Sequence, residues 1–277
     1  MGMRINTNIS SIAAQRALGV TKNNLDNNFR KLSTGERITR SSDDAAGLAI
    51  SEKLKGHIRG LRQAKRNSDD GISLIQTAEG GLNEVSSLVI RLRELAVQAA
   101  SDTVGDTERG FSDIEFQNLK DEIQRIAKGS EFNGRKLLDG SGGLVEIQVG
   151  IHNDAINDRI KYDSSETDAS LQSLGINYET IENKEGAQLS LSKLDDALLR
   201  INGVRANLGA LQNRLQSTSN NLMVTEENYS AANSRIRDVD VAAETAELAK
   251  NNILTQAGVS VLSQANQNSN AALKLLG

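Results

Sequence analysis

Seven-residue spacing of apolar side chains dominates two long stretches of the chain. In the first stretch one heptad position is apolar apart from Ser68, and it holds Leu54, Leu61, Ile75, Leu82, Val89 and Ala96. In the second the spacing is unbroken through Leu194, Ile201, Leu208, Leu215, Leu222, Tyr229 and Ile236. A heptad repeat sustained over this distance is typical of a coiled-coil seam. We therefore predict two long helices, 45–100 and 190–235, packed antiparallel along these residues.

A shorter helix and a β-hairpin are expected between the two long helices. Apolar residues recur at helical spacing over 108–128, which predicts the short helix. Val145, Ile147 and Val149 then alternate with polar residues, and this period of two predicts a hairpin within 140–165. Residues 163–188 are polar and irregular, so we expect them to form an exposed tip.

Both chain ends have amphipathic helical patterns with few large side chains. Burial of apolar surface contributes about 25 cal/mol per Å², so such stripes stabilise each end only weakly. We expect the two ends to pair and to complete their packing in an assembly. The candidate polymerisation residues are Ile5, Ile9, Leu18, Leu25, Phe29, Leu32, Ile253, Leu254, Val261, Leu262, Leu273 and Leu276.

These elements predict a mainly α fold, an elongated antiparallel helical bundle or coiled-coil rod with one small β-hairpin region and paired N- and C-terminal helices. The expected terminal domain joins residues 1–44 with 236–277, and the expected rod domain is 45–235. The chain of 277 residues contains no proline, so no proline interrupts the long helices.

Composition narrows the function classes. The net charge of −4 with 25% charged residues argues against a general nucleic-acid binder, which is usually strongly basic. Without cysteine, disulfides and thiolate metal sites are impossible. The N-terminal MGMRINTNIS lacks the apolar region of a secretory signal peptide, and no apolar stretch approaches the roughly 20 residues that span a bilayer, so no membrane insertion is expected.

Catalytic chemistry has no candidate in this sequence. The histidines are His57 and His152, which we interpret as structural, and no zinc-binding pair or phosphate-binding glycine loop is present. Adjacent acids such as Asp69 and Asp70 are more typical of helix-dipole complements than of a catalytic pair. We therefore predict no enzyme activity, no catalytic or metal site and no cofactor.

A basic stripe lies on the first long helix, where Lys55, Arg59, Arg62 and Arg66 follow one another at helical spacing. Nucleic-acid binding is one interpretation, but no aromatic residues interleave with the stripe. A solvated face, or a contact with acidic residues of a neighbouring subunit, is favoured.

Specific motifs at both ends resemble those of bacterial flagellins. The N-terminal motifs are LSTGERITRSSDDAAGLAISEKL from residue 32, GLRQAKRNSDDGISLIQTAEGGLNE, RLRELAVQAA at 91–100, FNGRKLLDG and EIQVG. The C-terminal motifs are LGALQNRL at 208–215, AANSRIRDVDVAAE at 231–244 and ILTQAGVSVLSQANQ at 253–267. The resemblance covers nearly the whole chain except about 163–190, where many flagellins insert outer domains. The extreme C-terminus, QNSNAALKLLG, departs from many relatives.

The resemblance implies a short flagellin that polymerises through its terminal helices into the extracellular flagellar filament, for motility. It further implies type III export from the cytoplasm, an export chaperone, and filament cap and hook-junction proteins as partners. A hook–filament junction protein remains an alternative in the same system, and a monomeric coiled-coil adaptor remains one of another class.

Arg91, Leu95 and Glu115 form a candidate receptor or inter-subunit surface. Leu95 lies on a helix face turned away from the seam residues, so the core does not obviously need it. The resemblance implies that this surface meets the animal Toll-like receptor for flagellin. Peripheral packing of Leu95 against the short helix is the alternative.

Overall fold

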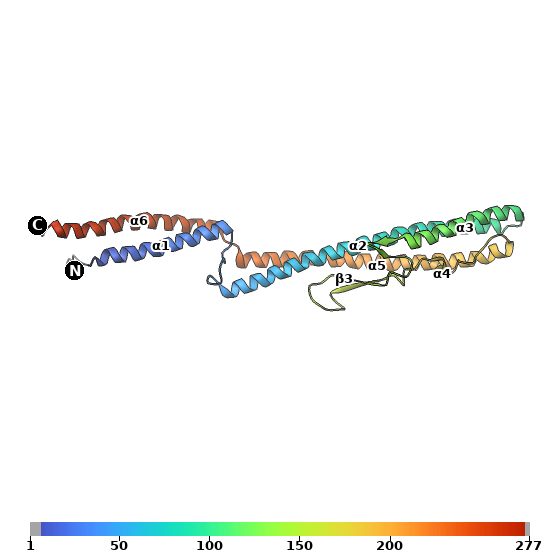
Figure 1. Cartoon of the computed structure of the whole chain (residues 1–277), viewed down its shortest axis with the longest axis horizontal. Helices are drawn as coiled ribbons and strands as arrows, with labels where there is room; N and C mark the ends of the chain where they lie inside the picture. Colours follow the sequence, from blue (N-terminus) through green and yellow to red (C-terminus); the bar gives the residue numbers. More distant parts are fainter. Residues whose placement is uncertain (1–6, 275–277) are drawn as a thin grey trace. The chain divides into compact units, whose positions relative to one another are not determined.

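The computed structural model describes residues 7–274, with side chains described over 7–267. Ten elements follow one another in this part of the chain (Figure 1): α1 (Ile9–Thr34), α2 (Ala45–Ala99), α3 (Asp106–Gly129), β1 (Glu131–Phe132), β2 (Arg135–Lys136), β3 (Leu144–Gln148), β4 (Arg159–Asp163), α4 (Leu171–Leu174), α5 (Lys184–Arg237) and α6 (Val241–Lys274). The mainly α fold with small β-hairpins is confirmed. Helix α5 begins six residues earlier than the heptad pattern indicated.

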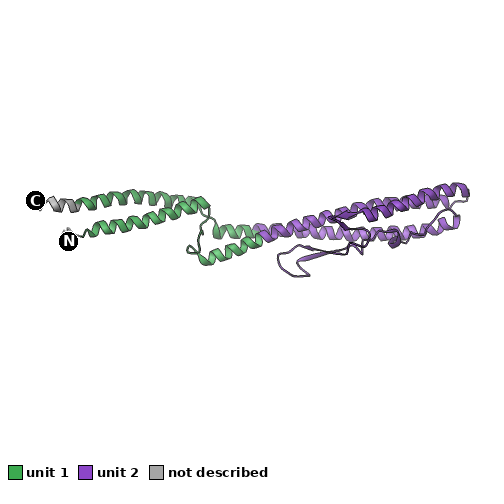
Figure 2. Ribbon diagram, in the orientation of Figure 1, with its two compact units in different colours: residues 1–58, 228–277 green, residues 59–227 purple. Residues whose placement is uncertain are grey.

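The chain divides into two compact units, coloured separately in Figure 2. The terminal unit consists of residues 1–58 and 228–277, and the rod unit consists of residues 59–227. Helices α2 and α5 contribute residues to both units. The expected division at residues 44 and 236 instead follows the two interhelical connections, and it remains a prediction about function.

In the rod unit α2 and α5 run antiparallel in one constant register. Arg62 bonds Glu226, Ser219 bonds Asp69, and Arg93 bonds Asp195. From the first of these bonds to the second, the partner moves seven residues forward along α2 and seven backward along α5. From the second to the third it moves 24 residues along each helix, again in opposite directions. Such a register is what two continuous heptad stripes impose on facing helices.

The predicted seam residues form the interior of this helix pair. Those of the rod unit are all buried: Leu61, Ile75, Leu82, Val89, Leu194, Ile201, Leu208, Leu215 and Leu222. Leu54, which belongs to the terminal unit, is half-buried. One core cluster joins α2, α3, α4 and α5 around Phe116, and the next joins α2 and α5 to the hairpins around Tyr162.

The predicted hairpin is confirmed, and a smaller one precedes it. Strands β3 and β4 pair antiparallel, with Ile147 opposite Ile160 and both side chains buried against the helices. Gly71 permits this approach, because a Cβ on Gly71 would lie 2.6 Å from the Ile147 side chain. Strands β1 and β2 are joined by Asn133 and Gly134, which both have positive φ, as expected of an Asn-Gly hairpin turn.

The expectation that residues 163–188 form an exposed tip is wrong. Short helix α4 lies within this segment. Five apolar side chains of the segment are buried in the core: Leu171, Leu174, Ile176, Ile181 and Ala187. The polar residues of the segment made it look like a surface loop. Its apolar residues are widely spaced, but they join one core cluster with α2, α3 and α5, which a one-dimensional pattern does not reveal.

Candidate assembly surface on the terminal helices

Helices α1 and α6 lie side by side in the terminal unit (Figure 1) and run antiparallel. At one end the Asn8 amide donates to the Ala265 carbonyl at 2.8 Å, and at the other Lys31 approaches Glu244 at 3.6 Å. Midway, a Cβ on Gly258 would lie 3.2 Å from the Leu18 side chain. The small residue at 258 thus allows close approach of the two helices.

The seam between α1 and α6 consists largely of small and polar side chains. Asn28 and Asn251 are each 6% exposed and bond each other, while Ser11 bonds the Asn266 side chain. Leu18, Leu25, Leu32 and Leu262 are half-buried beside this seam. A buried amide pair fixes register, but it contributes less to stability than an apolar pair would.

The large apolar residues of the pair instead face outwards. Phe29 is 53% exposed and Ile253 is 65% exposed. The other exposed large apolar residues of the two helices are Ile9, Ile12, Val20, Val241, Leu254, Val259 and Val261. Exposed apolar residues concentrated on two adjacent helices are typical of a protein–protein interface. We call this set, whose members lie at several positions around the two helices, the outer face.

The structure therefore divides the predicted polymerisation residues into two groups. Ile9, Phe29, Ile253, Leu254 and Val261 lie on the outer face, whereas the leucines at 18, 25, 32 and 262 support the helix pair. Ile5 and Leu276 lie outside the described residues, as does the side chain of Leu273. The sequence pattern did not indicate that Ile12, Val20, Val241 and Val259 are exposed together with them.

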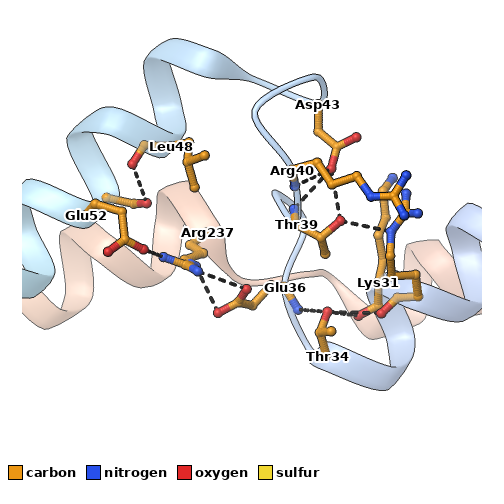
Figure 3. Close-up of polar contacts among 11 residues, drawn as sticks. Lys31, Thr34, Glu36, Thr39, Arg40, Asp43, Leu48, Glu52 and Arg237 are labelled. Carbon is orange, nitrogen blue, oxygen red and sulfur yellow. Dashed lines mark hydrogen bonds and ion pairs between the residues drawn. The ribbon is translucent and has the colours of Figure 1, made fainter.

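Residues 35–44, which connect α1 to α2, and residues 238–240, which connect α5 to α6, form a hydrogen-bonded joint (Figure 3). Gly35 ends α1 in a left-handed conformation with φ of 72°, and its carbonyl accepts from the Val239 amide at 3.0 Å. Arg237 holds both Glu36 and Glu52 by ion pairs. The two connections are thus bonded to each other and to the start of α2.

Asp43 orders the α1–α2 connection from inside. Its carboxylate accepts from the Thr39 amide at 3.1 Å, the Thr39 hydroxyl at 3.0 Å and the Arg40 amide at 3.0 Å. These hydrogen bonds, of which the one from the Thr39 amide is strongest, hold the pKa of Asp43 below its usual range. Asp44 then begins α2 by accepting from the Gly47 amide at 2.8 Å.

The second candidate surface, on α2 and α3, is only partly exposed. Arg91 and Glu115 meet in an ion pair of 2.9 Å at the surface. Leu95 is 3% exposed and belongs to the core cluster with Phe116. The expectation that the core does not need Leu95 is wrong, because α3 packs on a second face of α2. A contact at this surface would therefore use Arg91 and Glu115.

The described residues include no metal-binding group and no membrane-spanning helix, and His57 has a packing role. His57 packs its ring edge-on against Tyr229, with the centroids 5.9 Å apart. No group of three or more His, Asp or Glu side chains in the described part of the chain is arranged to hold a metal ion. Among the same residues, no helix is both long and apolar enough to cross a membrane.

Two family descriptions match the chain at its two ends. Residues 5–142 match the bacterial flagellin N-terminal helical region, and residues 191–276 match the bacterial flagellin C-terminal helical region. The chain is 46% identical over 274 residues to a flagellin of Halalkalibacterium halodurans, covering 99% of this chain and all of the relative. It is 40% identical over 286 residues to the flagellar filament 30.7 kDa core protein of Treponema maltophilum, again covering 99% and 100%.

Solved structures agree with these matches. The crystal structure of Bacillus cereus flagellin is similar with a TM-score of 0.51 and 34% identity, covering 57% of this chain and 88% of that one. A putative flagellar hook-associated protein from Vibrio parahaemolyticus has a TM-score of 0.58 at 14% identity, covering 71% of this chain and all of that one. The second similarity concerns the fold alone.

Proposed function

The chain belongs to the bacterial flagellin family and is a structural subunit of the flagellar filament, and we propose that the outer face of α1 and α6 makes the contacts between copies. It is a structural protein, not an enzyme, and its place is the extracellular filament. The hook–filament junction alternative is not favoured, since the hook-associated structure shares only the fold.

The observation that supports this proposal is that the α1–α6 pair buries polar residues and exposes large apolar ones. Its seam contains Asn28 and Asn251, while Phe29, the residue after Asn28, and Ile253, two residues after Asn251, are exposed. Covering these side chains with neighbouring copies would bury apolar surface, which stabilises association. In this proposal residues 1–44 and 236–277 act as the inner-tube domain, and residues 45–235 act as the rod.

The partners of the filament subunit follow from the same surface. We propose that an export chaperone covers the exposed apolar residues of α6, such as Ile253 and Val259, while the chain is in the cytoplasm before type III export. A polymer built from unlike patches exposes an unpaired patch at each end. We assign those ends to a filament cap and to hook-junction proteins.

A role as ligand of the animal flagellin-sensing Toll-like receptor is a second proposal. It rests on the exposed Arg91–Glu115 pair, whose charges lie on the outside of the α2–α3 packing. Because Leu95 is buried beneath them, receptor contact would be polar at this point.

Polar substitution of the outer face tests the polymerisation proposal. The double variant Ile253→Ser/Leu254→Ser should remain a folded monomer, because both side chains are exposed, but should not polymerise on filament seeds. Ile156→Ser is the matched control, since Ile156 is an exposed residue of the rod-unit hairpin turn and should leave polymerisation intact. Normal filaments from the double variant would refute the assignment.

A further inference from the structure

Tyr178 is the most exposed of the large apolar and aromatic side chains described in the rod unit, at 92%. It lies in a turn closed by a hydrogen bond from the Glu179 amide to the Ile176 carbonyl. Ile176 before it and Ile181 after it are both fully buried. The tyrosine is therefore presented to solvent by a segment that is anchored on both sides.

A buried lysine fixes the backbone around this tyrosine. Lys120 of α3 is 4% exposed, and its ammonium group donates to the carbonyls of Asn177 at 3.0 Å and Glu179 at 2.8 Å. Burial lowers the pKa of Lys120, because the ammonium group loses contact with water. The two carbonyl acceptors replace the hydrogen bonds that water would otherwise accept from it. Asp113 of α3 adds a bond from the Ile181 amide at 2.8 Å.

Exposed tyrosines on a fixed backbone are favourable binding anchors. Tyr, Trp and Arg dominate interface hot spots, and a backbone that is fixed before binding leaves less conformational entropy to lose on association. Tyr162, by contrast, is buried and bonds the Leu137 carbonyl. These two bonds of Lys120, which we call the Lys120 clamp, thus fix the backbone of a residue whose side chain the core of the subunit does not use.

The surroundings of Tyr178 are acidic. Glu179, Glu182 and Glu185 follow it in sequence, and the last two have exposed side chains. The basic residue among them, Lys184, pairs with Asp102 at 2.8 Å. A partner of this surface should carry exposed cations, which also interact favourably with an aromatic ring face.

Such cations lie at the other end of the rod unit. Arg59, Arg62 and Arg66 share one face of α2, and we call them the arginine stripe. Arg62 pairs with Glu226, but among the described residues neither Arg59 nor Arg66 forms an ion pair. The stripe therefore retains charge that the subunit does not neutralise.

We propose that Tyr178 and its acidic neighbours dock on the arginine stripe of a second copy of this chain. The inference rests on the proposed filament function and adds a contact in the rod unit to those of the terminal helices. Ser190, which bonds Glu179, is level with the end of α2 in the antiparallel register, so about 50 Å of helix separates the two surfaces. Unlike surfaces at opposite ends of one unit make a head-to-tail contact, which generates an open helical polymer.

Seeded polymerisation of the full chain, followed by sedimentation, tests the pairing. Tyr178→Ala and the double variant Arg59→Glu/Arg66→Glu should each raise the critical concentration about tenfold, as expected of hot-spot residues. The combined triple variant should have a critical concentration no higher than that of the more impaired of these two variants, because mutational effects within one contact are not additive. Lys128→Glu, which reverses one exposed positive charge on α3 as each arginine substitution does on α2, is the control and should change little.

Three results would overturn the inference. Polymerisation of Tyr178→Ala at the wild-type concentration would show that the tyrosine is not a contact. Multiplicative effects in the triple variant would show that the two surfaces meet different partners, and an equal effect of Lys128→Glu would show a nonspecific charge effect. Failure of the wild-type chain to polymerise would instead refute the filament role, and the inference with it.

Discussion

Asn251 donates to Asn28 at 3.5 Å inside the α1–α6 seam, and both amides are buried. The adjacent Phe29 is exposed, as is Ile253 two residues after Asn251. The terminal helix pair therefore buries polar residues in its seam, with half-buried leucines beside them, and leaves other large apolar residues exposed. This arrangement explains how one pair of helices can hold together in a single chain and still present an assembly surface.

The amide pair predicts a specific pattern of mutational effects. Asn28→Leu alone should destabilise the terminal helices by about 1–3 kcal/mol, because Asn251 then loses its partner in a buried position. Asn28→Leu/Asn251→Leu should recover most of this loss, since neither side chain then leaves an unpaired polar group. Hydrogen exchange of α1 amides in the monomer measures both effects, and a double variant as unstable as the single one would contradict the account.

The α1–α2 connection should loosen in acid through Asp43. Its pKa is lower in the folded state, so its ionised form stabilises the connection above the ordinary aspartate pKa of about 3.9. That stabilisation is lost as the pH falls below this value. Exchange of the Thr39 and Arg40 amides should therefore accelerate beyond its intrinsic rate below that pH, and Asp43→Asn should remove this extra dependence. An unchanged profile in Asp43→Asn would show that another group controls it.

Lys120 should matter for stability although it is charged. Lys120→Met removes the donor to the Asn177 and Glu179 carbonyls and should lower the free energy of unfolding by about 2 kcal/mol. Denaturant unfolding followed by circular dichroism measures the change. Lys128→Met on the same helix is exposed and should stay within about 0.5 kcal/mol of wild type. Equal effects of the two substitutions would argue against the clamp.

Substitutions of Leu95 and Arg91 should differ in their effect on the free energy of unfolding, because Leu95 is a core residue and Arg91 is a surface residue. Leu95→Ala leaves a cavity in the core and should cost about 2–5 kcal/mol of unfolding free energy. Arg91→Ala removes an exposed ion pair and should cost less than about 1 kcal/mol. If Leu95→Ala is nearly neutral in unfolding, the residue is not the core residue that the structure shows.

The long-range pattern of the fold could be predicted from sequence because it is one-dimensional. Heptad spacing located α2 and α5, and alternation located the β3–β4 hairpin. The burial of Leu95 and Ile176 could not be predicted in this way. Both depend on α3 packing laterally on other elements, and a single helical period describes only one face.

The site was predictable to a similar degree. Amphipathic ends indicated assembly, but the pattern treated every apolar position alike and so mixed Leu18, beside the seam, with Ile253 on the outer face. The ion pairs of Arg237 with Glu36 and Glu52 join residues about 200 positions apart in sequence, and no local signal pairs them. A helix N-terminus signal did exist at Asp44, which precedes α2.

Thiol labelling of Ile253→Cys tests the central claim most directly, because the natural chain has no cysteine to interfere. Ala265→Cys, at a buried position in the seam of the same helix, provides the reference for a protected thiol. The account predicts rapid labelling of Ile253→Cys in the monomer and labelling as slow as that of the Ala265→Cys reference once filaments have formed. Equally rapid labelling in monomer and intact filament would contradict the claim that the outer face of α1 and α6 joins the copies.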